Sequence, residues 1–303
     1  MTENQQGSIV KAMAWMLAST LLFVGMTGIV RHLGSDMSAP QAAFIRYGFG
    51  ILLLSPFLLR IKPREIVSRR MGVHALRGFV HGFGVMLWFF AMARIPIAEV
   101  TALSFTTPIF VTIGAAIFLG ERFRSRRMIA VLFGLLGTLV IIRPGFVTIE
   151  MGTWAMLVAA PLFAGSALVS KKLTETESSA VIIALMSLFV TLTLLPFALA
   201  TWRAPTPEEL AWLFTAASFA TLGHYTLTQA YKAAEITVTQ PLSFLQLVWA
   251  AILGYAVFAE TPDPYTVAGS IVIVGSATYI AHREARLSRL PPDAAPRATT
   301  ESR

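Results

Sequence analysis

Long apolar stretches separated by short polar segments dominate the pattern along this chain. A helix needs about 20 residues to cross a hydrocarbon core of roughly 30 Å, and ten stretches are interpreted as such helices. They run from Met13 to Val30, Ala42 to Leu59, Leu76 to Ala93, Ile97 to Leu119, Ile129 to Ile142, Gly152 to Ser170, Ala180 to Thr201, Leu210 to Ala230, Val238 to Phe258 and Thr266 to Ala281. The pattern predicts an all-α membrane protein with ten transmembrane helices. The first stretch is interpreted as a helix and not as a signal peptide, because further spans follow it at once and no clear cleavage site does.

The composition favours lipid over water as the solvent. Of the 303 residues, 55% are hydrophobic and 13% are charged, with a mean hydropathy of +0.68, whereas a soluble domain has roughly 25% charged residues. Soluble globules of this composition could not cover their surfaces with so few charges. The chain has no Cys, which excludes disulfides, thiol nucleophiles and thiolate metal sites.

Basic residues alternate between the predicted loops. When the loops are assigned in turn to two sides, 19 of the 24 Lys and Arg residues fall on one side and four on the other, with Arg46 inside a span. By the positive-inside rule, both termini are predicted to be cytoplasmic in an inner membrane. Insertion and anionic lipid headgroups account for the net charge of +8, so no nucleic acid is expected as a partner.

The second half of the chain repeats the first at an offset of 139 to 140 residues. Matched positions include Phe23 with Phe163, Gly25 with Gly165, Gly84 with Gly223, Leu103-Ser104-Phe105 with Leu242-Ser243-Phe244, and Glu121 with Glu260. Each unit has an odd number of spans, so the two are predicted to enter the membrane from opposite sides. The predicted division is one five-helix repeat over 1–145, a second over 146–285 and a disordered cytoplasmic tail over 286–303.

Three stretches carry a family resemblance. They run from Arg77 to Ala91, from Ala102 to Glu121 (ALSFTTPIFVTIGAAIFLGE) and from Pro241 to Glu260 (PLSFLQLVWAAILGYAVFAE). With the Gly-rich fifth span and the Arg143-Pro144-Gly145 that follows it, they resemble the two EamA repeats of the drug/metabolite transporter superfamily. The likeness covers nearly the whole chain.

The resemblance implies a ten-helix bundle with a central cavity lined by the first, third, fourth, sixth, eighth and ninth spans. Members of the family export amino acids, import choline, S-adenosylmethionine or riboflavin, or carry nucleotide sugars, so it implies no single substrate. The second repeat departs from the family pattern at two places. Ala259 precedes Glu260 where the first repeat has Gly120, and the apolar Ile182 to Leu188 replaces the region of Arg46.

Arg46 lies about one third of the way into the second span from the predicted external face. Insertion scales put the cost of a charged side chain at the centre of a span at roughly 2.5 to 3.5 kcal/mol, so a partner is expected. One interpretation is that Arg46 attracts an anionic group of the substrate. The other is a structural pair with Glu99, or with carbonyls at a helix end.

His81 and His224 lie inside the third and eighth spans. His81 shares a helix face with Arg77, which lies near the cytoplasmic end of its span and is expected to extend to the membrane surface. Either histidine could take up a proton during transport. Each could instead form an interhelical hydrogen bond.

Polar faces on the fourth and ninth spans predict a substrate cavity between the two halves. Residues spaced three apart along a helix lie on one face, so each trio of polar residues shares a face. A glutamine in lipid is costly unless it is paired. Ser and Thr can instead bond to their own helix backbone. Pro108 and Pro241 interrupt these helices and free carbonyls that need partners. The trios are Thr101, Ser104 and Thr107 in one repeat, and Gln240, Ser243 and Gln246 in the other.

Aromatic residues on the expected cavity helices could stack on a planar or cationic ligand. With them, the candidate substrate-binding set is Arg46, His81, Trp88, Thr101, Ser104, Thr107, His224, Tyr225, Gln240, Ser243, Gln246 and Trp249.

Taken together, these patterns predict a secondary transporter that moves a small organic metabolite by alternating access. An amphipathic solute such as riboflavin or an amino-acid derivative is the favoured cargo. No phosphate-cradling GxxxxGK[ST], no HExxH and no paired deep carboxylates occur in the sequence, so no ATPase, catalytic, cofactor or metal site is expected. A membrane-embedded enzyme, a passive channel and a non-transporting scaffold stay open as alternatives. The expected partners are a small-molecule substrate and the bilayer, and a homodimer stays open.

Overall fold

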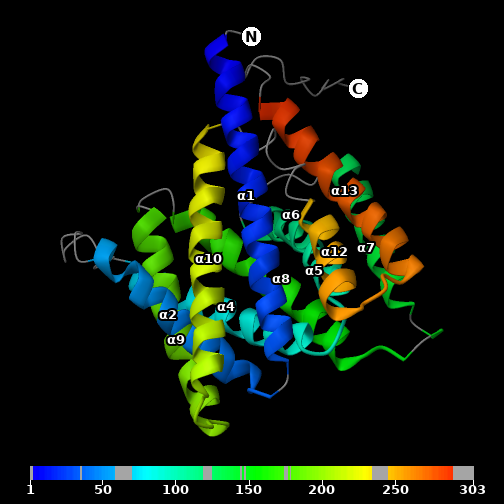
Figure 1. Cartoon of the computed structure of the whole chain (residues 1–303). Coiled ribbons are helices and arrows are strands. Elements are labelled where there is room, and N and C mark those ends of the chain that lie inside the picture. Colours follow the sequence, from blue (N-terminus) through cyan, green and yellow to red (C-terminus); the bar gives the residue numbers. More distant parts are fainter. Residues whose placement is uncertain are drawn as a thin grey trace, which may run out of the picture.

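The computed structural model describes residues 3–34, 36–58, 70–118, 125–143, 145–146, 148–173, 177, 179–233 and 245–288, and all regular structure in these ranges is α-helical (Figure 1). The helices are α1 Glu3–Leu33, α2 Ala39–Leu58, α4 Met71–Met92, α5 Ile97–Ser104, α6 Thr107–Phe118, α7 Ser125–Ile142, α8 Met151–Leu173, α9 Ser179–Ala200, α10 Pro207–Ala233, α12 Leu245–Phe258 and α13 Pro264–Ser288.

Within these ranges, four helices are long and apolar enough to cross a membrane. The qualifying segments are Val10–Leu33, Met71–Met92, Met151–Ser170 and Val181–Ala200. Every other predicted span also contains a described helix, but ten crossings stay a prediction. Helix α13 continues three residues into the segment predicted as a disordered tail, and residues 289–303 lie outside the described part.

The fourth predicted span is broken into two helices. Helix α5 ends at Ser104 and α6 begins at Thr107. The break confirms the interruption expected at Pro108, whose backbone nitrogen has no hydrogen to donate to the carbonyl of Ser104. The equivalent position in the second half, Pro241, lies outside the described residues.

The closest helix packing joins the two halves of the chain. Helix α1 packs along α10, α4 packs against α8 and α9, α2 packs against α9, and α7 packs against α13 (Figure 1). Under the repeat found in the sequence, α1 corresponds to α8 and α4 corresponds to α10. The α1–α10 and α4–α8 contacts are therefore equivalent to each other.

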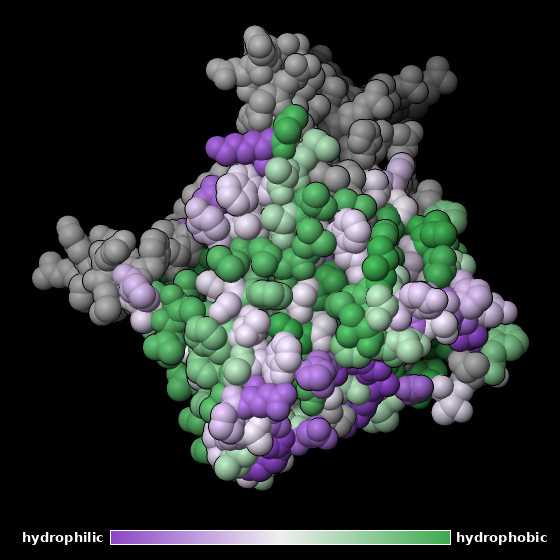
Figure 2. All heavy atoms as spheres, in the orientation of Figure 1, coloured by the Kyte–Doolittle hydropathy of each residue, from purple (hydrophilic) through white to green (hydrophobic). Residues whose placement is uncertain are grey.

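The first helix begins and the last ends at the same end of the bundle, the upper end in Figure 1. The connections from α1 to α2 and from α9 to α10 lie at the lower end. Hydrophilic residues gather at that lower end, and hydrophobic side chains cover the middle of the visible face (Figure 2). Ile117, Leu199, Val257 and Ile271 are between 61% and 67% exposed. A surface of this kind is suited to contact with lipid.

Gly78 allows the closest approach of α4 to α9. A Cβ added at this position would overlap the Cβ of Phe189 and lie 3.0 Å from the Phe189 carbonyl carbon. Gly72, one and a half turns earlier in the same helix, would meet nothing within 4 Å.

We therefore expect Gly78→Ala to lower the free energy of unfolding by about 1–3 kcal/mol, because the added methyl group overpacks the α4–α9 contact. The matched control Gly72→Ala should leave stability unchanged or raise it by up to about 1 kcal/mol through helix propensity. Thermal unfolding of the detergent-purified variants measures both. Equal stability of the two variants would contradict the close packing of α4 on α9.

Candidate substrate site

Arg46 on α2 is buried against aromatic rings. Its guanidinium carbon lies 3.8 Å from the centroid of the Tyr47 ring and 5.9 Å from that of Phe89 on α4. The residue is 9% exposed, and its Nε has no hydrogen-bond partner within the described ranges. The structural pair with Glu99 considered above is wrong, because Glu99 instead accepts a hydrogen bond from the Thr153 hydroxyl at 2.8 Å.

Tyr47 connects Arg46 to the third predicted span. Its hydroxyl lies 3.1 Å from Nε2 of His81, and the ring of Phe163 on α8 lies 5.2 Å from the His81 ring. Arg77, one turn before His81, is buried and donates from Nη1 to the carbonyl of Ile182 on α9 at 3.2 Å. The expectation that Arg77 extends to the membrane surface is therefore wrong, since its head lies between helices.

His224 on α10 belongs to the same neighbourhood. The positive charges of Arg46 and Arg77 act on both His224 and His81, and the two histidines lie within electrostatic range of each other. The Phe23 ring on α1 lies 5.0 Å from the His224 ring. The His224 residue is exposed in this chain.

Two of the three polar residues in the trio of the fourth span bond to the backbone of their own helix. Thr101 and Ser104 donate from their hydroxyls to the carbonyls of Ile97 and Val100, each at 2.8 Å. This is the local bonding that was considered as their alternative role. Half-buried Thr107 starts α6 after the break.

Of the corresponding trio in the second half, the structure describes only the last residue. Gln246 is half-buried on α12, whereas Gln240 and Ser243 lie outside the described residues. A cavity between these two polar faces therefore stays a prediction.

The candidate aromatic residues occupy three different places. The Trp88 ring lies 5.3 Å from that of Phe89, which in turn lies near Arg46. Tyr225 is exposed and lies 6.4 Å from Trp15. Trp249 is half-buried, and its indole Nε1 has no hydrogen-bond partner in the described part of the chain. The Trp88 ring thus contacts a residue that lies near Arg46.

The ion pair of Arg31 and Glu260 joins the two halves at the lower end of the bundle, and sequence reasoning did not predict it. The Arg31 Nη2 and Glu260 Oε1 atoms are 2.6 Å apart, and Arg31 also donates to the carbonyl of Met92 at 3.0 Å. The Ile97 backbone N–H at the start of α5 donates to Glu260 Oε2 at 2.9 Å. The sequence signal was present, since each partner is a charged repeat mate at the end of a span, but depth along a helix does not reveal which groups face each other.

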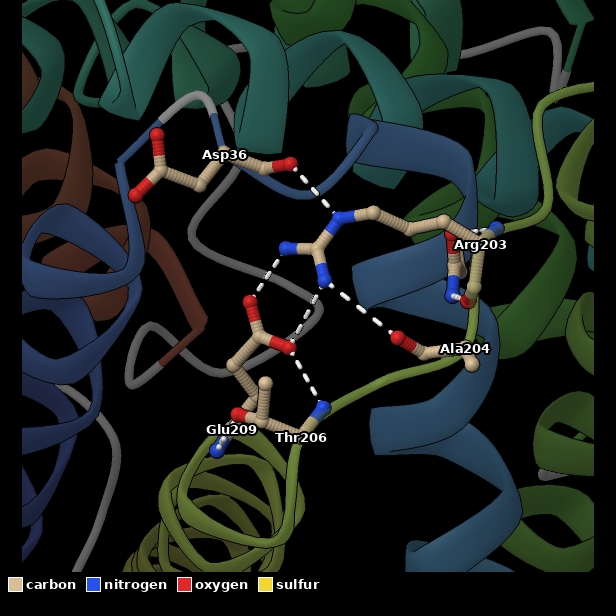
Figure 3. Close-up of polar contacts among 6 residues, drawn as sticks. Asp36, Arg203, Ala204, Thr206 and Glu209 are labelled. Carbon is tan, nitrogen blue, oxygen red and sulfur yellow. Dashed lines mark hydrogen bonds and ion pairs between the residues drawn. The ribbon is translucent and has the colours of Figure 1, made fainter.

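Arg203 forms a second connection at this end (Figure 3). Its guanidinium forms a bidentate ion pair with Glu209 in the first turn of α10. Its Nε also donates a hydrogen bond to the carbonyl of Asp36 at 2.9 Å. Hydrogen bonds from Arg203 hold the pKa of Glu209 down at about 2. Thr206 and Glu209 exchange hydrogen bonds with each other's backbone N–H, which is a capping box. Through its bonds to Asp36 and Glu209, Arg203 connects the α1–α2 connection to the start of α10.

Two hollows of about 240 and 210 Å³ open near the lower end. The first lies between the α1–α2 connection and the end of α4, and the second lies between residues 141–153 and 261–266. None of the candidate residues lines either of these two hollows.

Comparison with known proteins places this arrangement in a family. The sequence profile of the EamA-like transporter family matches residues 10–143 and again residues 150–281. The chain belongs to the EamA-like transporter family. This EamA chain is accordingly a multi-pass membrane protein and a transporter.

Three curated relatives align with most of the EamA chain. An S-adenosylmethionine uptake transporter of Rickettsia bellii is 28% identical, covering 89% of this chain and 93% of the relative. A riboflavin transporter of Rhizobium johnstonii is 30% identical over 91% of this chain and 93% of the relative. A pseudopaline exporter of Pseudomonas aeruginosa is 27% identical over 84% of this chain and 90% of the relative.

A solved crystal structure is similar in fold. It has a TM-score of 0.61 and 17% sequence identity, and the match covers 92% of the EamA chain and 99% of the other. At this level of identity the likeness supports the fold alone.

Ala259, at the place where the second repeat departs from the family pattern, has a backbone φ of +54°. This left-handed conformation costs a residue with a Cβ roughly 1–2 kcal/mol and costs glycine little. The strained turn carries the following Glu260 back toward α12, where the Glu260 N–H donates to the Gly254 carbonyl at 2.9 Å.

We expect Ala259→Gly to raise the free energy of unfolding by about 0.5–1 kcal/mol, because it relieves this strain. The matched control Ala256→Gly, in the regular part of α12, should instead lower it by about 1 kcal/mol. Thermal unfolding of the two variants beside the parent protein provides the measurement, and a destabilised Ala259→Gly would contradict the strained turn.

Proposed function

We propose that this chain is a secondary carrier that moves a small organic metabolite across the bacterial inner membrane by alternating access. In this proposal, ten helices form two five-helix repeats of opposite orientation, residues 1–145 and 146–285, and both termini are cytoplasmic. The observation that carries the proposal is the separate match of each half of the chain to one transporter family.

Packing between the halves supports opposed repeats. A Cβ at Gly84 would lie 3.0 Å from the Phe163 ring, and a Cβ at Gly223 would lie 3.0 Å from the Phe23 ring. The two glycines are repeat mates, and so are the two phenylalanines. Two contacts that exchange when the halves exchange are what a two-fold axis between inverted repeats produces.

The proposed site lies between the halves, around α2, which packs against both α4 and α10. The basic residues around Tyr47 and the accessible side chain of His224 support this location. For Thr101, Ser104, Thr107, Gln240, Ser243, Gln246, Trp88, Tyr225 and Trp249, a role in lining the path is a proposal from sequence position and repeat symmetry.

Relatives that carry S-adenosylmethionine and riboflavin support an organic cargo with a planar ring. We propose such an amphipathic metabolite for this chain. A homodimer remains compatible with the proposal, which needs only one chain.

Flux into proteoliposomes tests the proposal. With riboflavin and radiolabelled S-adenosylmethionine as cargoes, we expect saturable uptake of at least one of them, with competition by unlabelled cargo. Gln246→Ala should lower this uptake roughly tenfold or more while the variant still inserts, because the lost amide faces the proposed path. Uptake equal to that of empty liposomes for every cargo tested would overturn the carrier proposal.

The Arg31–Glu260 pair is proposed to close the external side in this conformation. We expect Arg31→Glu to favour the outward-open form by about 1 kcal/mol or more, roughly a fivefold change in the ratio of states, because like charges then face each other. The double variant Arg31→Glu/Glu260→Arg should restore the balance.

Cysteine labelling measures this shift, because the chain has no native Cys. Thr101→Cys, buried in this structure, should react faster with a membrane-impermeant thiol reagent from outside in the Arg31→Glu background. Arg94→Gln serves as the control, since Arg94 bonds the Phe90 carbonyl of its own helix end. Failure of the charge exchange to restore slow labelling would contradict the closing role of the pair.

A further inference from the structure

We infer that Arg46 and Arg77, together with His81 and His224, form a site on α2, α4 and α10 that binds an anionic group, carboxylate or phosphate, of an organic substrate. This inference rests on the proposed carrier function and adds a property of its cargo. We refer to the four residues as the basic cluster.

Arg46, His81 and Arg77 of the basic cluster are grouped around Tyr47, and His224 lies within their electrostatic range. The Arg46 guanidinium lies on the Tyr47 ring at 3.8 Å, and the Tyr47 hydroxyl lies 3.1 Å from His81. Arg77 follows one turn away on the same face of α4 as His81. Both histidines lie within the electrostatic range of both arginines.

Acidic groups are missing around His81 as far as the structure describes it. The charged groups that act on His81 are Arg46, Arg77 and His224. Arg77 lies within electrostatic range of the Tyr47 hydroxyl. Glu99, the acid expected to neutralise Arg46, bonds to Thr153 instead.

Buried donors of the cluster also lack partners. The Nε atoms of Arg46 and Arg77 and Nδ1 of His81 are buried, with no hydrogen bond among the described residues. A buried arginine costs stability in proportion to the charge that is not neutralised. A structure that retains two arginines here without a carboxylate leaves that neutralisation to a ligand, and a guanidinium fits carboxylate and phosphate oxygens equally well.

The surroundings of the cluster indicate an organic anion, because rings flank it on two sides. Phe89 lies 5.9 Å from the Arg46 guanidinium carbon, and Phe163 lies 5.2 Å from the His81 ring. Such rings supply apolar contact to the body of a ligand whose charged group sits on the arginines. The accessible His224 side chain provides the open side through which a ligand could reach them.

Two matched pairs of ligands test the inference. S-adenosylmethionine and its decarboxylated form differ by one carboxylate, and riboflavin 5′-phosphate and riboflavin differ by one phosphate. Binding to the full-length protein in detergent is measured by titration calorimetry and thermal shift. We expect the anionic member of at least one pair to bind about tenfold or more tightly than its partner, which is the effect of a charge-assisted hydrogen bond. The pair that shows the difference identifies carboxylate or phosphate as the group.

Variants then assign the preference to the cluster. Arg46→Gln and His224→Gln should each reduce the preference for the anionic member, whereas Arg46→Lys should keep part of it because the charge remains. Arg94→Gln removes an arginine outside the cluster and should leave the preference unchanged. The comparison of ligands on the parent protein stays decisive even if a variant does not fold.

Three results would overturn the inference: equal affinity within both pairs, absence of binding by either anion, or equal loss of affinity for both members of a pair in Arg46→Gln. Saturable flux of riboflavin without any preference for an anion would reject the inference and keep the carrier proposal. Preferential anion binding without flux of any cargo would keep the anion site and reject the carrier proposal.

Discussion

Two phenylalanine rings that pack onto two glycines fix the centre of this molecule. Lipid chains are as apolar as leucine, so helices in a membrane are held together by close van der Waals packing more than by hydrophobic burial. Phe163 on Gly84 and Phe23 on Gly223 provide such packing between the halves. His81 lies three residues before one of these glycines and His224 one residue after the other. The positions of both histidines therefore depend on these two contacts.

Hydropathy and proline positions were sufficient to predict the helical elements, because burial in lipid acts on every residue of a span and Pro108 acts on its own turn. The repeat was also readable, since the glycines that allow close packing are repeated with the rings that fill the space beside them. The sequence did not reveal which neighbouring helix a given side chain faces. For that reason the Arg46–Glu99 pair, one of the alternatives considered for Arg46, and the exposed position of Arg77 were wrong.

The candidate site was predicted in part. Periodicity placed Thr101 and Ser104 on one face, but a hydroxyl on a helix always has its own backbone carbonyl within reach, and both side chains use it. Tyr47 was not anticipated, because a tyrosine next to a buried arginine resembles any other aromatic residue until the helix carrying His81 is placed beside it. The contact that organises the basic residues is thus one between helices, and a single sequence carries little trace of it.

Glu260 uses its two carboxylate oxygens for different helices. Oε1 pairs with Arg31 at the end of α1, and Oε2 accepts the first N–H of α5, so this acid of one repeat caps a helix of the other. Loss of the ion pair would remove one link between α1 and Glu260 but leave α5 joined to the residue that follows α12. A movement of either repeat as a separate unit would have to break this cap, because it joins the start of α5 in one repeat to Glu260 in the other.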